Sequence, residues 1–235
     1  MTSDEGTPEG PFAAGRDLDA KQRAQLDAVL SMLAGDEHAP TAIREPGQAA
    51  DTHIADSLVA LSLDAVRTAG RIADLGSGAG FPGLALAVAL PATVVSLVES
   101  QRRKCEFLAR LLAAAEIENA RVVCSRAEEW REGESSCDVV VARALAPQPV
   151  VLEYAAPLLR MGGTMVDWRG RREQAAEEAG ERAAAMLGLE RVEIRRVVPF
   201  EGATDRHLHV FVKTAETPAR FPRRAGIARK RPLGG

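Results

Sequence analysis

A glycine-rich segment in the first half of the chain has the residue types of a ligand-binding turn. The apolar residues Ile72, Ala73 and Leu75 are typical of a buried parallel strand, and glycines at 76, 78 and 80 alternate directly after them. Glycine adopts positive φ readily and lets a ligand approach the backbone closely. Pro82 suits the first turn of a following helix, where its missing N–H is not needed. The segment therefore predicts a strand, a tight turn and a helix N-terminus whose free N–H groups face a bound molecule.

Two classes of ligand fit this turn. The stretch Gly78–Gly83 matches the pattern G-x-G-x-x-G, which is typical of nicotinamide and flavin sites. The longer string Asp74–Gly80, an acid followed by G-x-G-x-G, resembles the first motif of class I S-adenosylmethionine methyltransferases. A pyrophosphate is best bound with no anion nearby, whereas Asp74 would favour the cationic groups of a sulfonium amino acid. We therefore expect S-adenosylmethionine, with an NAD-dependent oxidoreductase as the alternative.

Charged residues that follow the later strands could complete the site, because ligands of open α/β sheets lie beyond the carboxyl ends of the strands. Glu99 ends the second predicted strand and could bind both ribose hydroxyls, or cap a helix. Glu128, in the segment 125–129 after the third strand, could help to read adenine, although an ordinary helical turn would look the same. Arg143 follows the fourth strand and could anchor a carboxylate, a phosphate or a base.

The composition is that of a globular protein of 235 residues, with 46% hydrophobic and 27% charged residues. No apolar run approaches the roughly 20 residues of a membrane span, and the polar N-terminus has no signal-peptide pattern. Cys105, Cys124 and Cys137 lack C-x-x-C spacing, so we expect neither a disulfide framework nor a zinc site, and we interpret Cys124 as a small buried strand residue. We predict a cytoplasmic protein without a metal.

The C-terminus carries an uneven share of the charge. The formal net charge is −3, yet residues 217–235 contain no acid and six basic residues, namely Arg220, Arg223, Arg224, Arg229, Lys230 and Arg231. Such asymmetry suggests a tail that binds a polyanion, although the same composition is typical of a solvated disordered tail. We expect removal of the chain after Ala215 to weaken RNA binding and to spare cofactor binding.

The periodicity of apolar residues divides the chain into four parts. We expect a disordered N-terminus at 1–17, a helical cap at 18–69 with helices at 18–33 and 49–68, a catalytic domain at 70–215, and the basic tail at 216–235. Within the domain the predicted strands are 72–75, 94–98, 121–124, 138–142, 164–168, 191–198 and 208–213. The predicted helices are 82–90, 102–115, 149–159 and 171–187. This alternation predicts a seven-stranded, mostly parallel sheet.

Over most of its length the chain resembles the RsmG (GidB) family of bacterial methyltransferases, which modify N7 of one guanosine in small-subunit ribosomal RNA. The similarity lies in H-I-x-D-S-L at 53–58, the glycine motif at 74–83 and F-P-R-R-A-G at 221–226. Shorter matches are Thr41–Arg44, Arg126–Glu128, Ala142–Ala144, Arg206–Leu208 and Lys230–Leu233. The chain departs from the family pattern at Glu99, where aspartate is commoner, and at Pro40.

The resemblance implies a class I methyltransferase (Rossmann-like) α/β fold, S-adenosylmethionine as cofactor, and small-subunit ribosomal RNA or the ribosomal subunit as partner. The cofactor contacts expected from the motif and the family are Asp74, Gly76, Gly78, Phe81, Glu99, Ala127, Glu128 and Arg143. The residues expected to contact RNA are Arg44, His53, Arg223, Arg224 and Lys230. His53 shares a helix face with Asp56, so this pair could instead hold the cap to the sheet.

A guanine N7 target would need no catalytic base, because N7 has an in-plane lone pair and no hydrogen. Catalysis would then rest on placing N7 in line with the methyl group and on excluding water. We expect Arg143→Ala to abolish methylation and to leave the fold intact. A non-catalytic RNA-binding assembly factor remains the second alternative.

Overall fold

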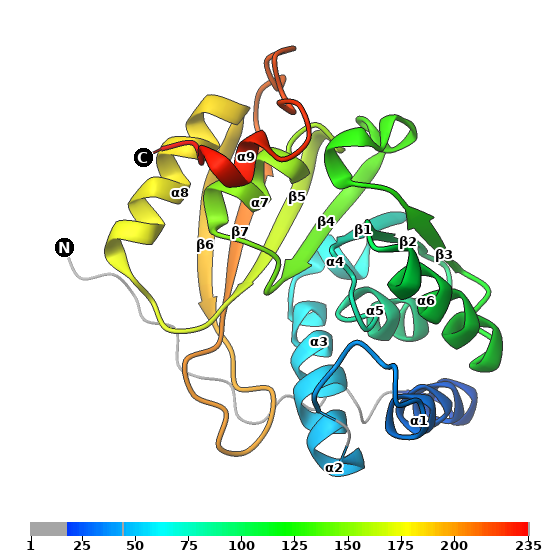
Figure 1. The fold of residues 1–235 in the computed structure, drawn as a ribbon. Coiled ribbons are helices and arrows are strands. Elements are labelled where there is room, and N and C mark those ends of the chain that lie inside the picture. Colours follow the sequence, from blue (N-terminus) through cyan, green and yellow to red (C-terminus); the bar gives the residue numbers. More distant parts are fainter. Residues whose placement is uncertain (1–17, 44, 235) are drawn as a thin grey trace.

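The computed structural model describes residues 18–43 and 45–234, and these form one seven-stranded sheet in the order β3-β2-β1-β4-β5-β7-β6 (Figure 1). Strands β1 to β5 run parallel, and β7 is antiparallel to both of its neighbours. The strands are β1 (Arg71–Leu75), β2 (Val94–Glu99), β3 (Ala120–Cys124), β4 (Cys137–Arg143), β5 (Leu159–Arg169), β6 (Leu189–Arg196) and β7 (His207–Lys213). The predicted fold class is confirmed.

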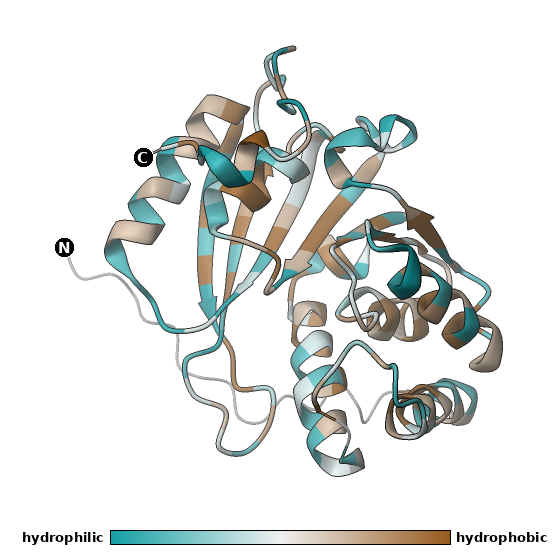
Figure 2. Ribbon diagram, in the orientation of Figure 1, coloured by the Kyte–Doolittle hydropathy of each residue, from teal (hydrophilic) through white to brown (hydrophobic). Residues whose placement is uncertain are grey.

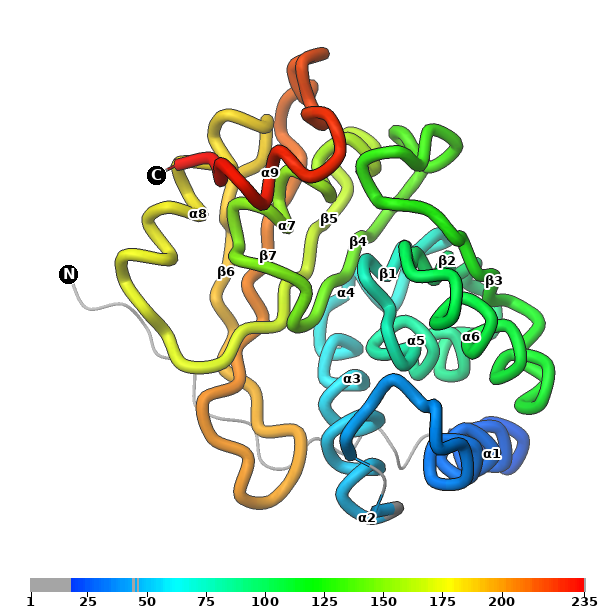
Figure 3. Tube along the Cα trace, in the orientation of Figure 1, coloured from blue at the N-terminus to red at the C-terminus, as the bar shows by residue number. Residues whose placement is uncertain are grey.

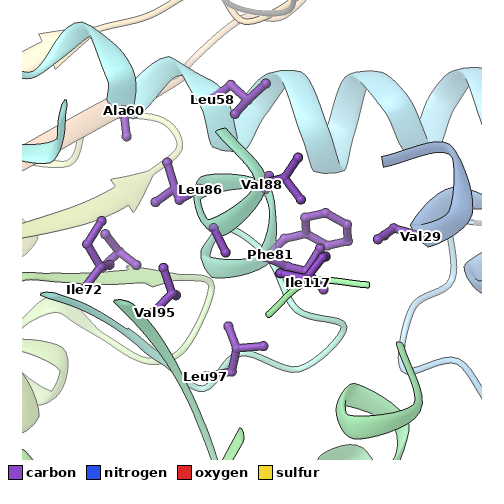
Figure 4. Close-up of a cluster of buried hydrophobic side chains, with 14 of the residues drawn as sticks. Val29, Leu58, Ala60, Ile72, Phe81, Leu86, Val88, Val95, Leu97 and Ile117 are labelled. Carbon is purple, nitrogen blue, oxygen red and sulfur yellow. The ribbon is translucent and has the colours of Figure 1, made fainter. Parts of the chain in front are cut away.

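Two hydrophobic cores lie on the two faces of this sheet, because neighbouring residues of a strand point to opposite sides. Val139 and Val141 of β4 belong to one core, and Val140 and Ala142 belong to the other. In Figure 2 the central strand β4 is mainly brown, in keeping with a strand that is covered on both faces. Figure 4 shows the first core, in which the ring of Phe81 lies among aliphatic side chains.

The helices that cover the two faces are amphipathic or wholly buried. Helices α1 (Ala20–Gly35), α5 (Gly83–Ala89) and α6 (Arg102–Ala114) contribute to the first core. Helices α7 (Gln148–Ala155) and α8 (Gln174–Leu187) contribute to the second. No helix among residues 18–43 and 45–234 is both long and apolar enough to cross a membrane.

The predicted single helix at 49–68 is wrong. The chain instead forms α2 (Pro46–Ala49), a π-helix (Ala50–Ala55), α3 (Asp56–Leu58), a 3₁₀-helix (Val59–Ser62) and α4 (Asp64–Arg67). A regular amphipathic helix would bury every third or fourth residue, whereas residues 56–60 are all buried here. The π-turn shifts the register, which brings His53, Asp56 and Ser57 to the inner side together.

The prediction for the cysteines also needs correction. Cys105 and Cys124 form a disulfide, with Cα atoms 5.7 Å apart, and Cys124 is exposed rather than buried. Their spacing in the sequence carries no signal. The pairing arises because Glu99 lies beside Cys124 in the β2–β3 register, and α6 begins directly after β2 and brings Cys105 to the same place.

The C-terminal segment, residues 217–234, is folded against the body of the protein. It contains the short helix α9 (Ile227–Lys230), and Figure 3 shows its trace passing over α7 towards α8. Phe221, Ala228 and Leu233 are buried in the second core. The predicted disordered N-terminus at 1–17 lies outside the described residues.

Candidate functional site

The glycine turn follows β1 and is fixed by backbone hydrogen bonds to β2. Gly76, Gly78 and Gly80 have φ values of +68°, +55° and +105°, which explains the three glycines. The N–H groups of Gly76 and Ser77 donate to the carbonyl of Val98 at 2.8 and 3.2 Å. A β-carbon at Gly76 would also collide with Leu145 from the loop after β4.

Asp74 is buried beneath this turn, with 1% of its surface exposed. Its Oδ2 accepts a hydrogen bond from the Gly83 N–H at 3.0 Å, so the carboxylate caps the start of α5. Its Oδ1 has no hydrogen-bond partner among the described residues. Burial raises the pKa of Asp74 to about 6. The side chain thus offers one unused acceptor atom beside the glycine turn.

Glu99 ends β2 and is also buried. One carboxylate oxygen accepts from the Gly78 N–H at 3.2 Å, and the other accepts from the Gln101 N–H at 2.8 Å. The first contact joins Glu99 to the glycine turn, and the second lies at the start of α6. Both sequence interpretations of Glu99, a ligand contact and a helix cap, are therefore compatible with its position.

Ala127 and Glu128 lie in a 3₁₀ turn (Ala127–Glu129) after β3. Glu128 is 8% exposed, and its Oε1 accepts a hydrogen bond from the Gly226 N–H at 3.1 Å. The C-terminal segment therefore contacts this turn directly. This contact could not be predicted from local sequence patterns, because 98 residues separate the two groups.

Arg143 lies at the end of β4 and is tied to the helical segment before β1. Its Nη1 donates to Asp56 Oδ2 at 2.7 Å and to the Thr52 carbonyl at 3.0 Å. Its guanidinium carbon lies 5.9 Å from the centre of the Phe81 ring. The charge of Arg143 is thus largely paired by Asp56 within the protein.

The His53 ring stacks on the ring of Phe81. The rings of His53 and Phe81 are nearly parallel, at 7°, with centroids 4.8 Å apart. His53 Nε2 lies 3.1 Å from Thr41 Oγ1, and Nδ1 has no partner among the described residues. Burial, with a smaller effect from Arg143, lowers the pKa of His53 to about 4, so the ring is neutral at pH 7.

Comparison of the chain with known proteins identifies its family. Residues 22–209 match the family described as rRNA small subunit methyltransferase G (GidB). The chain belongs to this family. A relative from Synechococcus elongatus, named ribosomal RNA small subunit methyltransferase G, is 36% identical over 220 residues, which cover 91% of each chain.

Solved structures share the fold of this GidB-family chain at lower identity. One is described as a predicted O-methyltransferase from Agrobacterium tumefaciens, with 24% identity, a TM-score of 0.52, and coverage of 69% of this chain and 80% of that one. Another is a variant of the protein MtNAS in complex with S-adenosylmethionine, with 14% identity, a TM-score of 0.56, and coverage of 83% and 73%. Both similarities concern the fold.

Asp56 makes more contacts than its position in the sequence indicates. Besides Arg143, its carboxylate lies 3.5 Å from Arg206 Nε, and its backbone carbonyl accepts from Trp168 Nε1 at 2.8 Å. These partners come from β4, β5 and the turn before β7. Arg206 belongs to a short family motif, but the motif did not indicate its partner.

The residues expected to contact RNA do not form one group. Arg44 lies outside the described residues. Arg223 is paired with buried Glu153, with Nη2 and Oε2 2.5 Å apart, and this pair holds the C-terminal segment against α7. Its contact with RNA stays a prediction. Arg224 and Lys230 have exposed side chains on that segment. They remain predicted phosphate contacts.

Proposed function

We propose that this protein transfers a methyl group from S-adenosylmethionine to N7 of a guanosine in small-subunit ribosomal RNA. Membership of the GidB family supports the substrate and the reaction. The structural observation that carries the proposal is the free Oδ1 of buried Asp74 beside the glycine turn.

The carboxylates at this edge of the sheet favour S-adenosylmethionine over a dinucleotide. Asp74 lies near the end of β1, Glu99 ends β2 and Glu128 follows β3, and all three are buried. Carboxylates match the ammonium, hydroxyl and amine donors of S-adenosylmethionine, whereas they would repel a pyrophosphate. The Gly83 N–H at the start of α5, where a pyrophosphate would be expected, already donates to Asp74.

In this arrangement Asp74 would hold the ammonium group, Glu99 the ribose and Glu128 the adenine. The Gly78 N–H would keep Glu99 in place, with Gly76 and Ala127 supplying backbone that the ligand can approach closely. When bound, S-adenosylmethionine supplies an electrophilic methyl group on its sulfonium. No proton has to be removed from guanine N7, so the side chains need only orient the base and exclude water.

The charges near Phe81 suit a base that becomes positive as it is methylated. Arg143 is neutralised by Asp56 at 2.7 Å, and His53 is uncharged at pH 7. Neither side chain therefore opposes the developing charge strongly. His53 Nδ1 would border the guanine, while Arg143 would contact its O6 or a neighbouring phosphate.

The deciding experiment is methyl transfer from labelled S-adenosylmethionine to small-subunit RNA, both naked and assembled in the subunit. Digestion and mass spectrometry should find 7-methylguanosine at a single position. Cofactor binding without methylation of either substrate would indicate the assembly-factor alternative. Binding of NADH in place of S-adenosylhomocysteine would indicate the oxidoreductase. A ribosomal RNA substrate would be met in the cytoplasm.

A further inference from the structure

A hollow of about 560 Å³ lies between α7, α8 and the end of the C-terminal segment, at the same edge of the sheet as the proposed methylation site and on the face that α7 and α8 cover. None of Asp74, Glu99, Glu128 and Arg143 lines it. It opens at the carboxyl end of β5, and Pro147 and Gln148 on its wall belong to the loop and helix that follow Arg143 and β4. Its volume is within the range of small-molecule sites, about 300–1,000 Å³.

The hollow contains a buried histidine whose outer nitrogen is unused. His209 is 3% exposed, and its Nε2 has no hydrogen-bond partner among the described residues. Burial lowers the pKa of His209 to about 4, so the ring carries a single N–H at pH 7.

The neighbours of His209 fix where that hydrogen lies. The Gln148 amide nitrogen lies 3.1 Å from Asp167 Oδ2 and 3.0 Å from His209 Nδ1. Asp167 also accepts a hydrogen bond from Arg169, which favours the ionised carboxylate. An ionised carboxylate can only accept, so the Gln148 amide is oriented with its nitrogen, the donor, towards Asp167 and His209. His209 Nδ1 is then an acceptor and Nε2 carries the hydrogen. The hollow thus presents a buried N–H donor that lacks an acceptor.

The rest of the wall combines apolar surface with arginines. Pro147, Pro149, Ala176 and Leu233 are apolar, while Arg169, Arg171 and Arg172 come from β5 and the loop before α8. Two carboxylates, Glu173 and Glu177, also line the hollow, and Arg172 pairs with the second through two hydrogen bonds of 2.9 Å. The wall therefore has three arginines against two glutamates. Arg171 has 81% of its side chain exposed and lies 4.0 Å from Asp205. A flat ligand with an acceptor on its edge and a negative group fits this lining.

We propose that the hollow is a second base-binding site, which takes an unstacked nucleotide of the RNA strand next to the one that is methylated. The base lies against the prolines, an acceptor on its edge receives the His209 Nε2 hydrogen, and its phosphate meets Arg171. This inference rests on the proposed function, since the two sites share one edge of the sheet and one RNA strand would span them.

Ala176→Trp tests the inference, because Ala176 is exposed on α8 and lines the hollow. Ala175→Trp is the matched control, since Ala175 is also exposed but does not line the hollow. A fluorescent single-stranded oligoribonucleotide should bind Ala176→Trp at least about tenfold more weakly than the native chain. The KM for RNA should rise similarly, with kcat and S-adenosylhomocysteine affinity unchanged, and Ala175→Trp should match the native protein.

Nitrogen NMR provides an independent readout on the native protein. The His209 Nε2–H signal should shift when the oligoribonucleotide is added and should not shift with AMP, CMP, GMP or UMP at the same concentration. Equal oligonucleotide affinity in both tryptophan variants would overturn the inference, and so would equally tight binding of a free mononucleotide. The binding measurements need no turnover, so they stay separate from a failure of the proposed methylation.

Discussion

The Gly226 N–H donates a hydrogen bond of 3.1 Å to Glu128, which joins the C-terminal segment to the turn after β3. A second tie lies nearby, where Arg223 pairs with buried Glu153 of α7. Glu128 is also the residue proposed to hold adenine. If Glu128 holds adenine, the basic tail forms part of the wall of the cofactor site, in addition to any contact that it makes with RNA.

Truncation after Ala215 should weaken cofactor binding, contrary to the expectation from the sequence. The truncated chain loses the Gly226 contact to Glu128 and uncovers Glu153 and the core around Phe221. We expect the affinity for S-adenosylhomocysteine, measured by calorimetry, to fall at least about tenfold, the equivalent of one charge-assisted hydrogen bond. Unchanged affinity in a folded truncated chain would show that the segment does not shape the cofactor site.

Arg224→Ala/Lys230→Ala tests the RNA role of the tail without unfolding it, since both side chains are exposed. The slope of log K for single-stranded RNA against log[salt] should fall by about 1.4, because each phosphate contact contributes about 0.7. Cofactor affinity should stay the same. The control is Arg67→Ala/Arg131→Ala, which removes two exposed arginines that precede β1 and β4 and so lie at the opposite edge. Equal salt slopes in the two double variants would remove the tail from RNA binding.

The sequence predicted the elements whose signal is local. The glycine turn, the seven strands and the helices beside them follow from apolar periodicity and from the conformational needs of glycine. Glu99 and Arg143 could be placed at one edge of the sheet because parallel strands end together.

Contacts between distant segments gave no such signal. Three such contacts depend on the tertiary fold, which brings distant parts of the chain together. They are the Cys105–Cys124 disulfide, the Arg223–Glu153 ion pair and the Gly226–Glu128 hydrogen bond. The π-turn before Asp56 was missed for a related reason, since tertiary packing at residues 56–60 overrides the regular helical period.

The pKa of Asp74 predicts how cofactor binding depends on pH. Burial raises this pKa to about 6, so the carboxyl group is mostly ionised at pH 7 and mostly protonated at pH 5. If the ionised form holds the ammonium group, the dissociation constant of S-adenosylhomocysteine should rise about tenfold between pH 7 and pH 5. In Asp74→Asn the affinity should be weaker at pH 7 and nearly constant over this range. A native profile that is flat from pH 7 to pH 5 would contradict the role given to Asp74.

Arg143→Ala should abolish methyl transfer and, unlike the expectation from the sequence, should also destabilise the fold. The substitution leaves Asp56 buried, with Arg206 at 3.5 Å as its remaining charged partner among the described residues. Loss of one partner from a buried ion pair costs about 3–5 kcal/mol in the free energy of unfolding, which denaturant titration would measure.

Arg143→Ala/Asp56→Ala removes both charges and should recover part of that stability. Activity should remain absent in the double variant at saturating RNA and cofactor, because no guanidinium is left beside Phe81 to orient the base. Recovery of activity together with stability would mean that Arg143 acts only by holding the helical segment to β4.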